Sequence, residues 1–243
     1  AVFCDYENVA LGAQDADFGS FDIDLVIERL LEKGKVVVKK AYSDWSRYDA
    51  AKRPLHEAAF ELIEIPHVSY SGKNTADIRL VVDALDLCYT KGHVDVFAIV
   101  SGDSDFSPLV SKLRENDKQV IGLGVKNSSS DLLIENCDEF IYYDDLVLEK
   151  RGSKRSSKSR GRGRDKAKTD TQGAKGSTEK VKEEDSADQE KRKQEGLELV
   201  LETVDSMFRE REDNVWGSMV KQTLKRKKPT FSEIFHGYRT FNE

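Results

Sequence analysis

The sequence predicts an α/β fold, namely a three-layer α/β/α sandwich with a mainly parallel sheet, followed by a small C-terminal all-α module. Over residues 1–150, short apolar runs of strand length alternate with longer segments of helical period, which is typical of a parallel sheet covered by helices on both faces. The run from Val94 to Val100 is almost entirely apolar, as expected of a central strand buried on both faces. Helical periodicity returns in residues 196–243, after a polar stretch.

The elements of the first region follow one another in a regular order. Apolar runs predict strands at residues 1–4, 36–42, 94–100 and 119–125, a brief strand near Val68, and an edge strand at 140–143. Helical spacing of apolar residues predicts helices at about residues 24–33, 50–63, 75–89, 107–116 and 131–136. Pro108 falls in the first turn of one of these helices, where a missing N–H is tolerated.

Composition divides the chain into three parts. Residues 1–150 carry 16 basic and 28 acidic side chains, a net charge of 16 − 28 = −12, and are long enough to bury a full core. Residues 151–182 carry 12 basic and 3 acidic side chains with almost no apolar residue, and the next residues are acid-rich. The sequence therefore predicts a globular domain at 1–148, a disordered linker, basic and then acidic, at 149–195, and a second domain at 196–243.

Charge and cysteine usage narrow the function classes. The run Arg151–Arg164 predicts a segment that binds a polyanion by counterion release, the alternative being a linker kept for solubility. Cys4, Cys88 and Cys137 show no paired spacing and no neighbouring histidines, so we expect buried thiols in a reducing compartment rather than disulfides or a zinc site. No apolar run reaches the roughly 18 residues of a membrane span. We therefore expect a soluble cytoplasmic protein.

Acidic side chains follow two of the predicted strands. Asp5 comes directly after the first strand, and Asp103 and Asp105 follow the run that ends at Val100. Asp77 falls in the first turn of a predicted helix. Because the functional crevice of an open α/β sheet lies beyond the carboxyl ends of its strands, we expect these four carboxylates to converge.

Such a cluster needs protons or a cation. Two carboxylates about 4 Å apart repel by roughly 4 kcal/mol at an effective dielectric of about 20. Oxygen ligands without His or Cys suit Mg²⁺ or Mn²⁺, and such an ion would polarise a phosphodiester. The alternative for each acid is a helix cap or turn former. We expect Asp83 and Asp86 to face solvent.

Neighbouring polar residues are secondary candidates. Asn8 is expected to orient water or the Asp5 carboxylate, Lys73 to hold a phosphate, and Ser101 to reach the metal. In the polar loop after residue 125, Lys126 and Ser128 are expected to meet phosphate near backbone N–H groups. The four histidines share no spacing, which argues against a His-based site.

Three motifs in order resemble the NYN domain, in its LabA-like branch, over most of residues 1–146. They are Phe3-Cys4-Asp5-Tyr6-Glu7-Asn8, the helix opening at Asp77, and Val100-Ser101-Gly102-Asp103-Ser104-Asp105-Phe106. The resemblance implies the PIN-like nuclease group, an α/β/α sandwich, and an acidic pocket that binds Mg²⁺ or Mn²⁺ and cleaves RNA. It assigns metal binding to Asp5, Asp77, Asp103 and Asp105, with Asn8 as a supporting catalytic residue.

The tail is similar to a LOTUS (OST-HTH) domain. Residues 196–209 predict a helix with Leu197, Val200, Leu201, Val204 and Phe208 on one face, and two further helices follow. The wing strands would fall beyond Glu243, so we expect an incomplete winged helix. Such modules resemble RNA binders, and the run Lys225, Arg226, Lys227, Lys228 would meet a phosphate backbone; a protein-interaction module is the alternative.

These observations favour a metal-dependent endoribonuclease whose linker and tail supply RNA affinity. The alternative is a non-catalytic RNA-binding regulator that keeps the metal pocket. A haloacid-dehalogenase-like phosphatase would need a second Asp two residues after the first, where this chain has Glu7. A phospho-accepting receiver domain is disfavoured because its paired acids adjoin one another near the first strand.

Overall fold

The computed structural model describes residues 1–65, 75–159, 180–210 and 216–231, together with residues 233, 236–238, 240 and 241. It divides into two compact units, Ala1–Glu149 and Lys150–Glu243. Each unit is described by itself.

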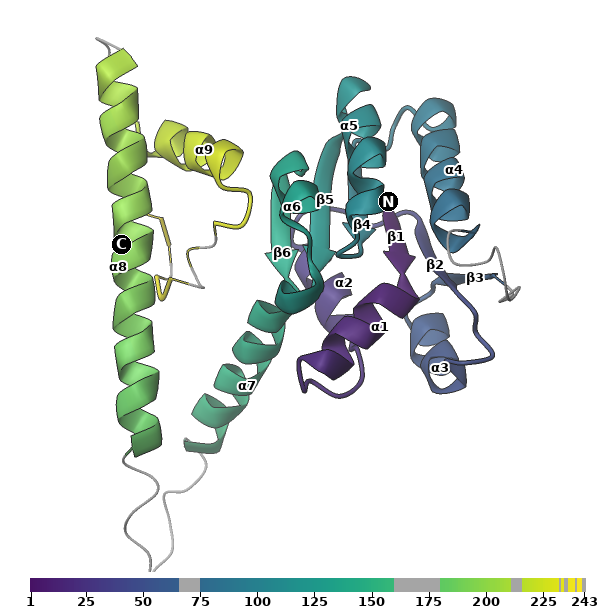
Figure 1. Ribbon diagram of the computed structural model, residues 1–243, viewed down its shortest axis with the longest axis horizontal. Coiled ribbons are helices and arrows are strands. Elements are labelled where there is room, and N and C mark those ends of the chain that lie inside the picture. The colour runs from purple at the N-terminus through teal and green to yellow at the C-terminus, as the bar shows by residue number, and fades with distance from the viewer. Residues whose placement is uncertain are drawn as a thin grey trace, which may run out of the picture. The chain divides into compact units, whose positions relative to one another are not determined.

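The first unit is built on one sheet, in which the described residues form six strands in the order β3-β2-β1-β4-β5-β6 (Figure 1). Every neighbouring pair is parallel. Strand order runs one way from β1 to β3 and the other way from β4 to β6, so the carboxyl ends of β1 and β4 flank a topological switch point, where ligands bind in such sheets. The strands are β1 (Val2–Asp5), β2 (Lys39–Ser43), β3 (Glu61–Glu64), β4 (Val96–Val100), β5 (Gln119–Gly124) and β6 (Glu139–Tyr142).

Helices cover both faces of this sheet, which confirms the predicted α/β fold (Figure 1). Side chains alternate between the faces along each strand, so Cys4 packs into one core and Phe3 into the other. The first core is closed by α1 (Tyr6–Asp15), α2 (Ile23–Leu31), α3 (Asp49–Glu57) and the start of α7 (Tyr143–Ser159). The second is closed by α4 (Thr75–Thr90), α5 (Ser107–Glu115) and α6 (Asp131–Asn136).

The central strand behaves as the sequence predicts. In β4, Phe97 and Ile99 pack into the second core, while Ala98 and Val100 pack into the first. All four are almost fully buried, and β4 pairs with β1 on one side and β5 on the other. Its uniformly apolar sequence follows from burial on both faces.

Two boundaries differ from expectation. Helix α3 ends at Glu57, and residues 61–64, with Leu62 and Ile63 at their centre, form β3 instead of prolonging the helix. The break lies at Ala59, whose φ of 59° is left-handed, a conformation that ends helices. Helix α1 was not predicted, although Val9, Ala10 and Ala13 recur on its buried side. The brief strand expected near Val68 lies outside the described residues.

The second unit contains α8 (Lys180–Glu210) and α9 (Gly217–Lys227). Helical backbone reaches Ser159 in α7 and resumes at Lys180, so both ends of the predicted disordered linker are helical; residues 160–179 lie outside the described part of the chain. At the α8 end, Lys, Glu and Gln are good helix formers, so a charged composition does not exclude a helix there. The domain boundaries themselves stay a prediction.

The buried side of α8 is not the one expected. Thr203 and Met207 are buried, whereas Leu197, Leu201 and Phe208 are 51%, 58% and 59% exposed. Helix α8 contacts α9, whose buried side chains are Val220 and Leu224. The sequence predicted one apolar face, but which side of α8 is buried depends on where α9 packs.

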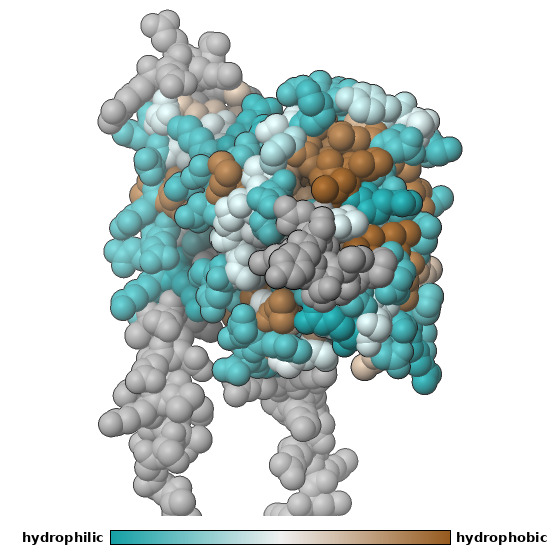
Figure 2. All heavy atoms as spheres, turned by 45° about the vertical axis from the view of Figure 1, so that its right-hand side comes forward, coloured by the Kyte–Doolittle hydropathy of each residue, from teal (hydrophilic) through white to brown (hydrophobic). Residues whose placement is uncertain are grey.

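The cysteines of the first unit are buried, whereas several apolar side chains of α4 are exposed. Cys4, Cys88 and Cys137 are buried free thiols, as predicted. Within the described ranges, no helix is long and apolar enough to cross a membrane. Apolar side chains of α4 reach the surface, with Ile78 62% and Val82 55% exposed, and Figure 2 shows apolar atoms gathered on the side of the molecule where α4 lies.

Candidate metal centre

Asp5 ends β1 and caps α1. Its backbone is extended and its side chain accepts a hydrogen bond from the Asn8 N–H, 3.4 Å from Oδ1. The Ser101 hydroxyl donates to the other carboxylate oxygen at 3.1 Å. Asp5 is 8% exposed, so two hydrogen bonds hold a buried carboxyl at the carboxyl end of β1.

The turn after β4 is tied to Asp5 through these same neighbours. The Gly102 N–H donates to Asn8 Oδ1 at 2.8 Å, and the Asp103 N–H donates to Ser101 Oγ at 3.2 Å. Asp103 caps a short 3-10 helix, η2 (Ser104–Phe106), by accepting from the Asp105 N–H at 3.0 Å. Asn8 and Ser101 thus fix the two strand ends at the switch point relative to each other.

Gly102 allows the next loop to approach this turn. A Cβ at Gly102 would collide with the Ser128 carbonyl oxygen and lie 2.8 Å from its carbonyl carbon. The Ser130 N–H donates to the Gly102 carbonyl at 2.9 Å. Backbone contact at this distance brings the loop after β5 beside the Asp103 turn.

Asp77 reaches the same edge from a third element. It lies in the first turn of α4, and α4 contacts both β1 and η2. Asp77 and Asp105 line one groove of about 680 Å³ between α4 and the start of α5. Asp77 and Asp105 therefore face a common groove, whereas Asp5 and Asp103 are not among the residues that line it.

The pKa values of Asp5 and Asp77 reflect the charges of the other carboxylates. Burial, followed by the charge of Asp77, raises the pKa of Asp5 to about 7; the hydrogen bonds from Asn8 and Ser101 oppose the rise, and Asp103 adds to it. Burial and then the charges of Asp103, Asp105 and Glu7 raise the pKa of Asp77 to about 6. Like charges at one site favour protonation unless a cation is present.

The donor set fits a hard cation. It consists of carboxylate oxygens with a serine hydroxyl nearby, which are ligands of Mg²⁺ and Mn²⁺ rather than of softer ions. Among the residues that the structure describes, no three Asp, Glu, His or Cys side chains lie close enough to form a complete metal site. The type of donor atom is therefore compatible with Mg²⁺ or Mn²⁺, but the described side chains do not form a complete coordination shell.

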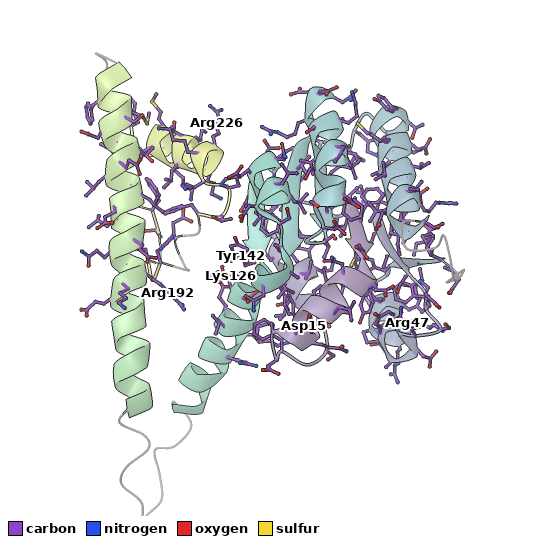
Figure 3. The ribbon with its side chains drawn as sticks, in the orientation of Figure 1. Asp15, Arg47, Lys126, Tyr142, Arg192 and Arg226 are labelled. Carbon is purple, nitrogen blue, oxygen red and sulfur yellow. The ribbon has the colours of Figure 1, made fainter. Side chains whose placement is uncertain are left out.

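The predicted nucleic-acid contacts are spread over the chain. Ser128 lies against the Gly102 turn. Lys126 follows β5 and is exposed. Its backbone N–H donates to Asp144 at 2.8 Å, and its ammonium lies 5.9 Å from the Tyr142 ring centre (Figure 3). Lys73 lies outside the described residues. The run of Lys225, Arg226, Lys227 and Lys228 ends α9 in the second unit.

Sequence reasoning missed two charged residues at this edge. Arg47 follows β2 and forms a 2.7 Å ion pair with Glu7 of α1, and Figure 3 shows Arg47 near α3. Glu7 contributes to the raised pKa of Asp77. Their positions after two parallel strands were a usable signal, but their pairing depends on β1 and β2 being neighbours.

Residues 1–146, which are more than half of the chain, match the NYN domain family. The chain belongs to the NYN domain family. This assignment places its first unit in the PIN-like nuclease group and agrees with the six-stranded parallel sheet described above.

Two relatives extend the NYN comparison. An uncharacterized protein of Methanocaldococcus jannaschii is 28% identical over 158 residues, which cover 62% of this chain and 62% of the relative. A crystal structure of a protein of unknown function from Vibrio parahaemolyticus is 28% identical with a TM-score of 0.53, and the match covers 60% of this chain and 92% of that one. The fold of the NYN domain is thus shared with a solved structure.

Proposed function

We propose that this NYN domain protein is a metal-dependent endoribonuclease that hydrolyses RNA phosphodiesters at Asp5, Asp77, Asp103 and Asp105. The observation that supports the proposal is electrostatic: the charges of Asp77 and Asp103 act on Asp5, and those of Asp103 and Asp105 act on Asp77. Family membership supports a nuclease-type hydrolase. RNA as substrate and the metal requirement are our own inference.

Each side chain of the site has a separate part in the proposal. Asp5, Asp77, Asp103 and Asp105 would hold Mg²⁺ or Mn²⁺, which when bound supplies a Lewis acid for the phosphodiester and lowers the pKa of water. Ser101 orients the Asp5 carboxylate by its 3.1 Å hydrogen bond. Asn8 positions the Asp103 turn by accepting from the Gly102 N–H.

The positively charged side chain of Arg47 would help to bind the RNA backbone near the carboxylates. Arg47 is half-exposed and its partner Glu7 is also partly exposed, so the pair is accessible to solvent. Exposed ion pairs contribute only about 0–1 kcal/mol, and exchange of Glu7 for a phosphate therefore costs little. We assign Arg47 to the RNA backbone on this ground.

The second unit would supply further RNA affinity. The first 150 residues carry a net charge of −12 by the counts given above, which repels RNA. The basic run at the end of α9 and the basic residues 151–182 offset this charge. We retain the LOTUS-like character of residues 196–243 and a protein partner for this region as proposals.

Cleavage of a labelled single-stranded RNA tests the proposal. The full chain is compared with Asp5→Asn and Asp103→Asn in Mn²⁺, in Mg²⁺ and in chelator. Asn is also a good helix cap, so both variants should fold. We expect cleavage to need the metal and to fall by at least about 100-fold in both variants.

The matched control is Asp86→Asn, which changes an exposed carboxylate further along α4. It should cleave as the unchanged chain does. Equal cleavage in all four proteins would rule out the four-aspartate site.

The second candidate function is a non-catalytic RNA-binding regulator that keeps the acidic pocket. It is favoured by the lack of a complete metal site among the described side chains. It predicts salt-sensitive RNA binding, with the RNA recovered intact after incubation with Mn²⁺. The cleavage assay therefore separates the two candidates.

A further inference from the structure

Helix α4 carries an apolar stripe on its exposed side. Ile78, Val82 and Tyr89 are 62%, 55% and 64% exposed, and Figure 2 shows apolar atoms gathered on this side of the first unit. Residues four and eleven positions apart lie within about 40° of one another on an α-helix, so these side chains form one line, with partly buried Leu85 between them. Apolar surface that gathers in this way marks an interaction site, whereas single exposed apolar residues do not.

The stripe is arranged so that it can pair with itself. When a second copy of α4 lies antiparallel to the first, Ile78 lies opposite Tyr89 of the second copy, and Val82 lies opposite its Leu85. The members of each pair are equally far from the middle of the stripe, so both pairs form in one register. A two-fold symmetric contact has this property, since the same surface is used on both subunits.

Opposite charges flank the stripe on one side. Arg79 and Asp86 are both exposed and lie seven positions apart, which is about two turns, so they share a side of the helix. In the antiparallel register, Arg79 of each copy lies beside Asp86 of the other. Arg79 uses Nε for Asp83 at 3.1 Å, and a guanidinium has further donors on its two terminal nitrogens. Both ends of the stripe can therefore form an ion pair between copies.

These two charges favour a second copy over other occupants. A partner with only basic flanks would suit Asp86 and repel Arg79, and a nucleic acid would do the reverse. A second copy satisfies both. Residues 1–150 carry a net charge of −12 by the counts given above, but salt at 0.1 M screens charges more than roughly 10 Å apart. At contact distance, the flanking pairs therefore count for more than the net charge.

We propose that the stripe of α4 joins two copies of this chain in an antiparallel, two-fold symmetric dimer. The apolar side chains form the centre of the interface, and the two Arg79–Asp86 pairs form its rim. An interface built on one helix from each copy is small, so the dimer should be weak and form in the micromolar range. Because Asp77 lies in the first turn of α4, the acidic sites of the two copies would lie at opposite ends of the helix pair.

Sedimentation velocity of the full chain over a dilution series tests the dimer. We expect the mass to rise from one chain to two as the concentration increases, without RNA and in chelator. Val82→Ser should weaken the dimer by at least about tenfold, because each copy loses apolar contact at the centre. Leu31→Ser is the matched control, because Leu31 of α2 is 55% exposed, as Val82 is. It should dimerise as the unchanged chain does.

Charge exchange tests the register. Arg79→Glu and Asp86→Arg each place like charges opposite one another at both ends, so each variant alone should dimerise at least about tenfold more weakly. When the two variants are mixed, both flanking pairs have opposite charges again, and a heterodimer should form about as strongly as the unchanged dimer. Recovery on mixing cannot be explained by loss of the Arg79–Asp83 ion pair, which stays absent from the Arg79→Glu chain.

Asp86→Asn completes the series of charge variants. It removes an attraction without adding a repulsion, and exposed pairs contribute little. Its dimer should therefore stay close in strength to that of the unchanged chain, between the unchanged chain and Asp86→Arg.

Three results would overturn the inference. They are a single-chain mass at every concentration, equal dimerisation of Val82→Ser and Leu31→Ser, and no heterodimer when Arg79→Glu and Asp86→Arg are mixed. The assay contains neither RNA nor a metal, so its outcome is independent of the proposed nuclease function. Absence of cleavage from a protein that dimerises as described would contradict the proposed function alone.

Discussion

At the scale of single residues, Asp5 combines a structural and an electrostatic role. It caps α1 and has a pKa of about 7 in the folded protein, against about 4 in an unfolded chain. Between about pH 4 and pH 7, Asp5 is therefore more often protonated in the folded state than in the unfolded state. The free energy of unfolding therefore receives its full contribution from Asp5 below about pH 4 and loses it as the pH rises through 7.

Asp5→Asn should stabilise the metal-free protein at alkaline pH. The amide cannot ionise, so at pH 8 in chelator we expect the free energy of unfolding to rise by roughly 2–4 kcal/mol, and near pH 4 the gain should vanish. Urea unfolding at pH 4, 6 and 8 measures this, with Asp86→Asn as the control. A loss of stability in Asp5→Asn at every pH would contradict the raised pKa.

Gly102→Ala should disturb the site through packing alone. The added Cβ would meet the backbone of Ser128, and backbone cannot move aside as a flexible side chain can. Overpacking of this kind costs about 1–3 kcal/mol, and we expect metal-dependent cleavage to fall with it. Gly92→Ala is the control, because nothing lies within 4 Å of its added Cβ. Equal denaturation midpoints for both variants would show that the loop after β5 moves aside and that the added Cβ causes no overpacking.

At the scale of elements, α4 is fixed to the sheet by a polar cluster that the sequence did not predict. Asp83 accepts hydrogen bonds from the Tyr42 hydroxyl at 2.9 Å and from Lys40 at 3.2 Å, and pairs with Arg79 at 3.1 Å. The expectation that Asp83 faces solvent was wrong, since its side chain is only 12% exposed. Burial opposes its ionisation, but these partners together lower the pKa of Asp83.

Tyr42→Phe should loosen the attachment of α4 to β2. It removes a donor to a buried carboxylate, and hydrogen bonds to charged groups contribute about 1.5–3 kcal/mol. We expect a loss of that order in the free energy of unfolding at pH 7, measured with urea. Tyr89→Phe, on the exposed end of the same helix, should change it little. Similar losses in both variants would show that the Asp83 cluster does not anchor α4.

Sequence patterns found most elements but not all of their limits. Helix α4 and strand β4 were predictable because their apolar residues have one clear period. Helix α3 and strand β3 were merged because Leu62 and Ile63 continue the apolar spacing, and the left-handed Ala59 between them leaves no compositional mark. Helix α1 was missed because polar Asp5 and Asn8 at its start read equally as a turn.

The same contrast holds for the candidate site. Asp103 and Asp105 were foreseeable because they follow an unmistakable strand. The Asp83 cluster and the Arg47–Glu7 pair were not, because each joins elements whose adjacency is a property of the sheet order. Local pattern therefore located the carboxylates, and topology decided which neighbours they have.

At the scale of the whole molecule, the first unit should stand alone. Ala1–Glu149 contains both hydrophobic cores, so a chain ending at Glu149 should unfold in one cooperative transition. Without the basic residues of the second unit, its RNA affinity should fall and depend less steeply on salt. Anisotropy titrations at several salt concentrations measure both. Unchanged affinity would show that residues 150–243 do not contribute to RNA binding.

Binding of Mn²⁺, measured by calorimetric titration of the full chain, tests the metal site most directly. We expect saturable binding by the unchanged protein and by Asp86→Asn, and affinity at least about tenfold weaker in Asp5→Asn. Proton release near pH 6 should accompany binding, because Asp5 and Asp77 have raised pKa values of about 7 and about 6. Equal Mn²⁺ affinity in the three proteins would contradict a metal centre at these carboxylates.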